Sequence, residues 1–99
     1  MNLEYRKLSE AEIAQGLSDL EGWSQEGDKI AKHFAFPNYL DGTAFASAVG
    51  YLAESLDHHP DIEIGWRKAK ISMNTHSVEG LSPYDFELAR RIEALSKKG

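Results

Sequence analysis

The sequence predicts an α+β protein in which an antiparallel four-stranded sheet carries three helices packed on one face. Three stretches place apolar residues at helical spacing, and two stretches between them alternate as β-hairpins do. The order along the chain is helix, hairpin, helix, hairpin, helix. An antiparallel sheet covered on one side buries the apolar face of every such element. The 99 residues are expected to form a single domain, 1–99.

The first helix is predicted over residues 9–21. Ser9 is followed three residues later by Glu12, which is the arrangement of a capping box. Ile13 and Leu17 then recur at helical spacing, and Gly22 ends the pattern. An amphipathic helix with its start and stop signals in place is therefore expected here.

The residues from Trp23 to Phe36 predict the first hairpin. Gly27 and Asp28 supply the turn, and the apolar residues after them share one parity, with Lys32 as the exception. Pro37 ends the second strand, because proline lacks the backbone N–H that a sheet ladder needs.

The second helix is the longest, and it is predicted to open near Asp41 or Thr43. Its core stripe lies within about 60° of arc and consists of Phe45, Val49, Leu52 and Leu56. The opposite side carries Ser47, Tyr51, Glu54 and His58. Proline disfavours the helical conformation of the residue before it, so Pro60 should end the helix at about Asp57 or His58 and turn the chain outward.

The second hairpin follows directly. Ile62, Ile64 and Trp66 alternate with polar residues, Arg67-Lys68 supplies the turn, and the alternation continues over 69–75. His76 is then expected at the end of a strand.

The last helix has the clearest start. Ser82 is its cap, Pro83 occupies the first helical position and Asp85 the third, while Leu81 and Phe86 take the two positions of a hydrophobic staple. The buried stripe of this helix is Leu88, Ile92 and Leu95.

Composition excludes several classes of function. Eleven Lys and Arg against sixteen Asp and Glu give a net charge of −5, which disfavours direct binding of nucleic acid or of an anionic membrane. The absence of cysteine excludes a disulfide framework, a thiolate metal site and a cysteine nucleophile. The amino terminus lacks the apolar stretch of a signal peptide and no segment is long enough to cross a bilayer, so the cytoplasm is the expected location.

Three of the four histidines gather in one part of the chain. Glu54 and His58 are four residues apart, so on a helix the carboxylate can orient the imidazole. His59 follows at once and His76 comes later, and histidines in different environments can supply an acid and a base together near neutral pH. Trp66 offers a flat apolar surface for a planar ligand. This set suits an elimination of water.

Each of these residues also has a purely structural explanation. Glu54 and His58 can be an exposed helical pair worth a few tenths of a kcal/mol, and His76 can be the solvent-facing residue of a strand. Trp66 is more often core or interface than a ligand platform, and Asp85 has a sufficient role as a capping carboxylate. Periodicity by itself therefore leaves the function undecided.

The residues taken together resemble the signature of the pterin-4a-carbinolamine dehydratases. The spaced set is Glu54-x3-His58-His59-Pro60-x5-Trp66-x9-His76-x8-Asp85. Flanking positions agree as well, namely Gly22-Trp23, Leu56-Asp57, Thr75 and Gly80-Leu81-Ser82. A spaced set of this many residue types is far more specific than any of its parts.

The resemblance implies the loss of water from a 4a-hydroxytetrahydropterin to give a quinonoid dihydropterin, which recycles a tetrahydrobiopterin-type cofactor. It implies His58, His59 and His76 as the acid/base group, without assigning the acid and the base. Glu54, Asp57, Pro60, Trp66 and Asp85 would bind the substrate or orient the histidines. No metal and no organic cofactor is implied. One position departs from the pattern, because many members carry an aromatic residue where this chain has Ile62.

Partners follow from the same resemblance. It implies a small-molecule pterin substrate and a homodimer or homotetramer built partly by strand edges that meet across a two-fold axis. The alternative from a different class is an interaction module, since some members of the family act as dimerisation cofactors of transcription factors. A third hypothesis is a metal site formed by the three histidines.

Overall fold

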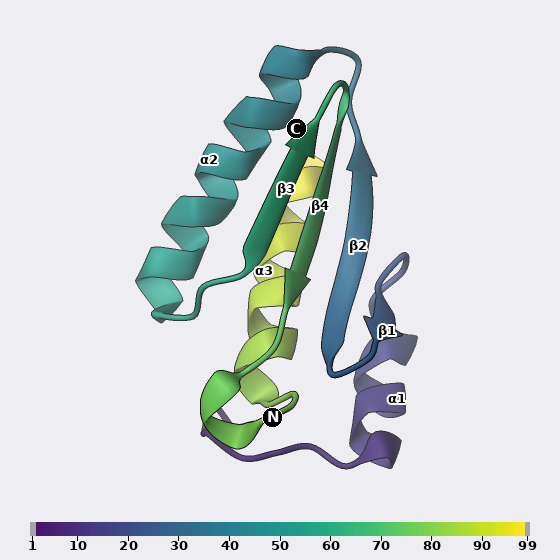
Figure 1. The fold of residues 1–99 in the computed structure, drawn as a ribbon, viewed down its shortest axis with the longest axis vertical. Helices are drawn as coiled ribbons and strands as arrows, with labels where there is room; N and C mark the ends of the chain where they lie inside the picture. The colour runs from purple at the N-terminus through teal and green to yellow at the C-terminus, as the bar shows by residue number, and fades with distance from the viewer. Residues whose placement is uncertain (1, 99) are drawn as a thin grey trace.

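The computed structural model describes residues 2–98 and contains four helical segments and four strands. In chain order these are α1 (Glu10–Ser18), β1 (Ser24–Glu26), β2 (Lys29–Ala35), α2 (Tyr39–Leu56), β3 (Asp61–Gly65), β4 (Lys68–Met73), the short 3-10 helix η1 (His76–Val78) and α3 (Pro83–Lys98). Figure 1 shows α2 and α3 running along the strands, with α1 at the end of the sheet that carries β1. The predicted order of helices and hairpins is confirmed.

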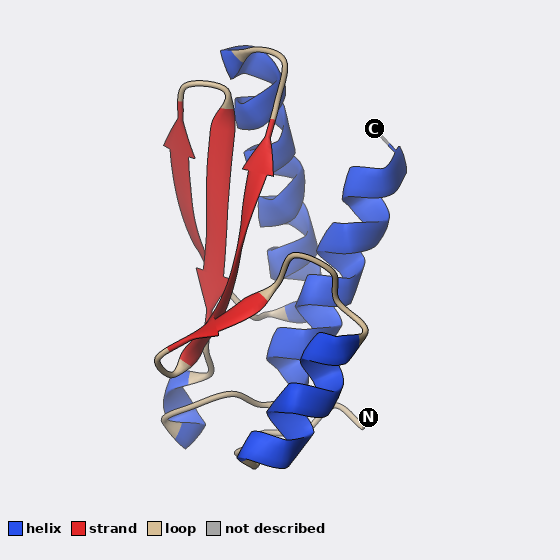
Figure 2. Ribbon diagram, turned by 90° about the vertical axis from the view of Figure 1, so that its right-hand side faces the viewer, coloured by secondary structure: helices blue, strands red, loops and turns tan. Residues whose placement is uncertain are grey.

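The four strands form one antiparallel sheet in the order β1-β2-β4-β3. Glu26 pairs with Lys29 across the first hairpin turn, and Gly65 pairs with Lys68 across the second. The side view in Figure 2 places all three α-helices on one side of the sheet. The predicted α+β class, with three helices on one face of an antiparallel sheet, is therefore confirmed.

The core lies between the sheet and the helices. Strands β2 and β4 supply alternate side chains such as Ile30 and Ile71, both fully buried. Helices α2 and α3 meet them with Val49, Phe86 and Ile92, which are equally buried. Because side chains alternate across a strand, the apolar parity of each hairpin faces the helices and the polar parity is left outside.

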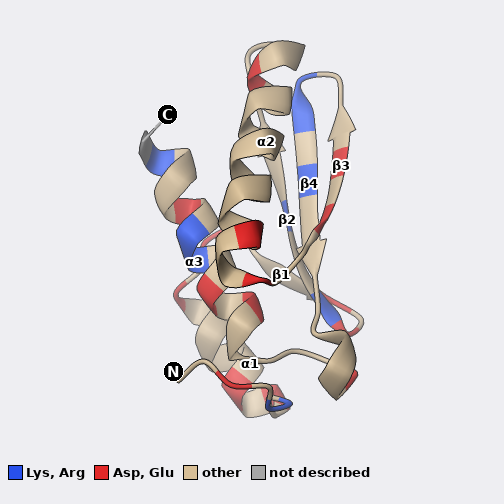
Figure 3. Cartoon of the chain, turned by 90° about the vertical axis from the view of Figure 1, so that its left-hand side faces the viewer, with Lys and Arg blue, Asp and Glu red and all other residues tan. Residues whose placement is uncertain are grey.

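The other face of the sheet is open and charged. Lys70 on β4 donates to Glu26 at 2.8 Å, and Lys29 on β2 donates to Asp61 at 3.0 Å. Figure 3 shows basic residues along β4 beside acidic residues on β3. Charges of both signs thus alternate over this surface and leave no single-sign field. Every helix within residues 2–98 is too short or too polar to span a bilayer.

Several boundaries differ from the prediction. Helix α1 ends at Ser18, earlier than expected, because residues 19–22 form turns. Helix α2 begins already at Tyr39, since the side chain of Asn38 accepts a hydrogen bond from the Asp41 N–H at 2.8 Å and caps the helix. The second hairpin turns one residue early, with Arg67 in the left-handed region at φ 63°.

Two glycines in helices provide a test of the packing. A Cβ at Gly16 would lie 2.6 Å from Phe86 Cε1, whereas a Cβ at Gly50 would meet nothing within 4 Å. We therefore expect Gly16→Ala to destabilise the fold by about 1–3 kcal/mol, because α1 must move away from the rigid ring. Gly50→Ala should instead stabilise it by about 0.5–1 kcal/mol through helix propensity.

Urea unfolding followed by circular dichroism measures both changes. Because each variant makes the same chemical substitution inside a helix, the difference between them isolates the contact with Phe86. Equal stability of the two variants would contradict the close packing of α1 on α3.

Candidate active site

The carboxyl end of α2 fixes the direction of the histidine pair. Asp57 adopts the left-handed conformation at φ 52° and ψ 44°. The His58 N–H donates to the Ala53 carbonyl at 3.1 Å and the Asp57 N–H to the Glu54 carbonyl at 3.2 Å. This pair of bonds is a Schellman motif, which ends the helix and reverses the chain. His58 is therefore turned inward instead of continuing along the exposed face of α2.

His58 contacts Asp85 rather than Glu54. Its Nε2 lies 2.6 Å from Asp85 Oδ1, and the two side chains are only 8% and 0% exposed. The expected pairing of Glu54 with His58 is therefore wrong, because it assumed helical geometry through a residue that lies beyond the helix end. The carboxylate that orients this imidazole comes from the first turn of α3, 27 residues further along the chain.

Both carboxylate oxygens of Asp85 accept hydrogen bonds. Its Oδ2 accepts from the Ser82 N–H at 2.9 Å and from the Thr75 hydroxyl at 2.7 Å. Since Thr75 donates to the carboxylate, Ser82 Oγ must donate to Thr75 Oγ1 across their 2.7 Å contact. The capping role predicted for Asp85 is present, and the same carboxylate also holds His58.

The orientation of His58 leaves one ring nitrogen for chemistry. Asp85 as a carboxylate only accepts hydrogen bonds, so the Nε2 of His58 carries the proton between them. Nδ1 is then the nitrogen that presents a lone pair in the neutral ring. A histidine held by a buried carboxylate can accept a proton at the other nitrogen, because the charge that develops is balanced at short range.

The other two histidines are exposed. His59 Nε2 lies 3.3 Å from Glu54 Oε1 in a solvated pair, so Glu54 orients His59. His76 begins η1 instead of ending a strand, because β4 stops at Met73 and Thr75 bridges to Gly80. A proton on either imidazole can exchange with water or with a ligand in front of it.

An open cleft of about 210 Å³ brings the three histidines together. Its lining residues are Tyr5, Asp57, His58, His59, Asn74, Thr75, His76 and Ser77. Asp57 lines the cleft, its backbone is left-handed and its side chain is exposed. Of the lining residues, Tyr5, Asn74 and Ser77 were missed, and Tyr5 in particular lies too far along the chain from the motif for any spacing rule to find it.

Larger hollows exist elsewhere on the molecule but offer less chemistry. One of about 490 Å³ lies on the open sheet face, where the cations Lys29 and Lys70 already pair with acidic residues. Another of about 470 Å³ lies near Lys32 and Glu93, which form an ion pair of 2.6 Å. Neither is lined by a histidine, so the smaller cleft is the candidate active site.

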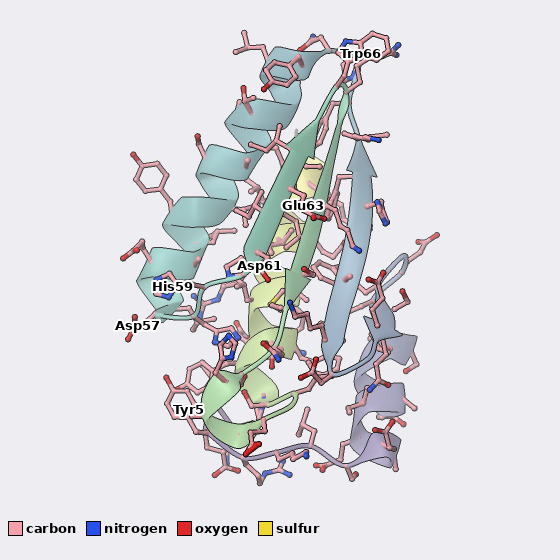
Figure 4. All side chains as sticks on the ribbon, viewed as in Figure 1. Tyr5, Asp57, His59, Asp61, Glu63 and Trp66 are labelled. Carbon is pink, nitrogen blue, oxygen red and sulfur yellow. The ribbon has the colours of Figure 1, made fainter. Side chains whose placement is uncertain are left out.

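Four motif residues do not line this cleft: Glu54 and Asp85 contact its histidines from outside it, and Pro60 and Trp66 lie further away. Trp66 is 73% exposed at the β3–β4 turn, and Figure 4 shows it at the opposite end of the sheet from Tyr5, Asp57 and His59. Within a single chain Trp66 does not line the cleft, because strand β3, which follows Pro60, runs away from it. Pro60 connects α2 to β3, and Ile62 packs against the core instead of shaping the cleft.

No group of three His, Cys, Asp or Glu side chains within residues 2–98 is placed to hold a metal ion. Nε2 of His58 is already engaged by Asp85 at 2.6 Å. The arrangement instead combines a buried histidine–carboxylate pair with two solvated imidazoles, which is typical of a catalyst that moves protons.

The fold and site define an α+β protein with a histidine cleft suited to acid/base chemistry. The family model described as pterin 4 alpha carbinolamine dehydratase matches residues 6–95. The chain belongs to the pterin-4a-carbinolamine dehydratase family.

Relatives support this membership at the level of both sequence and structure. A protein of Roseiflexus sp. (strain RS-1), provisionally named pterin-4-alpha-carbinolamine dehydratase, is 45% identical over 90% of this chain and 96% of its own length. A similarly named protein of Sulfolobus acidocaldarius is 37% identical over 90% and 98%.

Two solved structures share the fold. A transcriptional coactivator/pterin dehydratase from Brucella melitensis superimposes with a TM-score of 0.86 at 28% identity, over 90% of this chain and 97% of that one. A pterin dehydratase-like protein identified as a RuBisCO assembly factor in the alpha-carboxysome gives a TM-score of 0.65 at 28% identity, over 76% and 89%.

The buried pair can be tested through stability. Asp85→Asn keeps the shape but removes the charge that three donors face. We expect a loss of about 3 kcal/mol in the free energy of unfolding, since one donor then meets an N–H group. Asp61→Asn is the matched control, because its pair with Lys29 is exposed and should cost less than about 1 kcal/mol. Similar losses for both variants in urea titrations would contradict the central role of Asp85.

Proposed function

We propose that this chain is a dehydratase that converts a 4a-hydroxytetrahydropterin to a quinonoid dihydropterin and water. The observation that carries the proposal is the cleft in which the buried His58–Asp85 pair lies with two exposed histidines. Membership of the family gives the substrate class and the reaction. Its role would be to recycle a tetrahydrobiopterin-type cofactor after an aromatic hydroxylation.

The reaction requires two proton transfers on neighbouring atoms of the pterin. The bond between C4a and the hydroxyl oxygen breaks, and the oxygen takes a proton and leaves as water. N5 loses its proton, and the electron pair left on N5 forms the new double bond to C4a. One acid and one base working together are sufficient, and no oxidant or reductant is needed.

The environments of the histidines suggest how they divide this work. His58 accepts the N5 proton at Nδ1, because Asp85 holds its Nε2–H and stabilises the imidazolium that forms. His59 and His76 are solvated, so a protonated ring there can give its proton to the departing hydroxyl and regain one from water. Glu54 orients the ring of His59 through their 3.3 Å contact.

The activity has a direct test. The wild-type chain should accelerate dehydration of a 4a-hydroxytetrahydropterin above its spontaneous rate in a stopped-flow absorbance assay. We expect His58→Ala and His76→Ala to lower kcat about 100-fold or more, the usual effect of losing a positioned acid or base. Comparing His59→Ala with His76→Ala identifies the stronger proton donor.

His33→Ala is the matched control for these variants. His33 lies on β2, does not line the candidate cleft, and should leave turnover unchanged. Full activity of the His58 and His76 variants, with the fold retained by circular dichroism, would refute the assignment of the site.

We also propose that the chain forms a homo-oligomer through its β3 edges. In the described chain β3 is the last strand of the sheet and pairs only with β4, and Ile64 and Trp66 are 45% and 73% exposed beside that edge. In a symmetric antiparallel pairing, the end of one β3 lies next to the start of the other. Trp66 would then approach Pro60 and the histidine cleft of the second copy.

Oligomerisation is tested by sedimentation equilibrium. The wild type should have a multiple of the chain mass, and Ile64→Lys should produce monomers because it places a charge at the paired edge. Leu40→Lys is the control, since Leu40 is also apolar and is more exposed than Ile64, 73% against 45%, but lies in α2. If Trp66 acts on the other copy, mixing Trp66→Ala with His76→Ala restores activity that neither variant has by itself. A monomeric wild type would contradict the proposal.

A second candidate function is that of a protein-interaction module. The structural neighbours include a transcriptional coactivator/pterin dehydratase and a RuBisCO assembly factor, so this fold also serves roles that depend on protein partners. The exposed Tyr51 and Leu40 along α2 are the apolar side chains that such a partner would cover. Rapid pterin turnover by the purified chain would favour the enzyme over this alternative.

A further inference from the structure

The amino-terminal segment forms one side of the candidate cleft. The Leu8 N–H donates to the Leu81 carbonyl at 2.8 Å, and the Leu8 side chain is buried in the core, so Leu8 ties the amino-terminal segment to the fold. This anchor and the stacking of Tyr5 on Tyr84 place residues 5–8 beside the start of α3. Figure 4 shows Tyr5 beside η1, at the same end of the molecule as Asp57 and His59. Tyr5 is one of the residues that line the cleft.

Two tyrosine rings connect this segment to the buried histidine. Tyr5 stacks on Tyr84 with ring centroids 4.6 Å apart and an interplanar angle of 19°. Tyr84 in turn lies 5.9 Å from the His58 ring at 36°. Tyr84 is half-buried and supports Tyr5 from one side, whereas Tyr5 is 58% exposed. Tyr5 therefore presents ring surface that the described residues 2–98 leave exposed, in the same cleft as the proposed proton acceptor.

The chemistry of Tyr5 suits binding rather than proton transfer. Partial desolvation raises the pKa of the Tyr5 hydroxyl, and Tyr84 and Asp57 raise it further. The phenol is thus neutral at physiological pH and cannot act as a base. What it offers is a flat aromatic surface, and planar bicyclic ligands bind to such surfaces at little entropic cost. The cleft contains no other tyrosine, phenylalanine or tryptophan among its lining residues.

We propose that Tyr5 is the aromatic side chain against which the pterin ring lies, held in place by Tyr84. Tyr5 thereby takes, within its own chain, the role expected of Trp66 from the sequence. This assignment rests on the proposed dehydratase function for the substrate class. It makes Tyr5 a positioning residue that sets affinity for the planar ring, while the histidines carry out the proton transfers.

The test separates binding from turnover. Tyr5→Ala should raise KM for the 4a-hydroxytetrahydropterin about threefold to tenfold, the range expected for losing one aromatic contact, with kcat changed less than about twofold. The Kd of a 7,8-dihydropterin, which keeps the ring but has no 4a-hydroxyl to lose, should rise by the same factor. Tyr5→Phe should retain wild-type values, because the ring is kept. Tyr51→Ala is the control, since Tyr51 is exposed on α2 outside the cleft.

Each outcome decides the assignment. Unchanged KM and Kd in Tyr5→Ala, or equal losses in Tyr5→Phe and Tyr5→Ala, would overturn it. If thermal unfolding shows that Tyr5→Ala detaches the segment, Tyr5→Leu replaces it in the test, because leucine keeps the apolar bulk. A loss of affinity in Tyr5→Leu supports the ring contact. Wild-type affinity in Tyr5→Leu refutes it. A wild type that binds the dihydropterin without turnover refutes the dehydratase function, while the Kd ratio still decides the role of Tyr5. A wild type that does neither refutes both.

Discussion

The contact between His58 and Asp85 connects the parts of this molecule that the site depends on. It joins the residue just beyond α2 to the first turn of α3, and Thr75 after β4 donates to the same carboxylate. A carboxylate with no exposed surface is tolerated only when donors replace the water it has lost. Here an imidazole, a hydroxyl and a backbone N–H do so within 3 Å. The geometry of the cleft follows from satisfying this one group.

The same carboxylate serves folding and the proposed chemistry. As a capping group it accepts from Ser82 N–H at the start of α3, and as a partner of His58 it fixes which ring nitrogen carries the proton. The aromatic contacts from His58 through Tyr84 to Tyr5 extend this arrangement to the surface. The carboxylate that caps α3 is therefore also the one on which the proposed proton transfer depends, so we expect substitutions at Asp85 to lower both stability and activity.

The sequence predicted most of the fold, because element order depends on local patterns of apolar residues and caps. The motif also named His58, His59 and His76, which the structure brings into one cleft. The contacts between them were harder to predict. Glu54 was paired with the wrong histidine because a single left-handed residue, Asp57, ends the helix one step earlier than Pro60 requires. Trp66 lies at the far end of the sheet (Figure 4) because of the direction of its strand, and Tyr5 reaches the cleft because of how the chain packs. Neither position is encoded by the spacing of residues within a motif.

The left-handed conformation of Asp57 has a further consequence for how such a site can vary. The Schellman bonds that turn His58 inward involve only backbone atoms. Asparagine, aspartate and glycine all tolerate this conformation, so the side chain at 57 can be exchanged without moving the imidazole behind it. The charge of the residue at position 57, which lines the cleft, can therefore change while the backbone turn is kept. Substitutions at residue 57 can in this way change the charge that a ligand meets, while the backbone turn that places His58 in the cleft is kept.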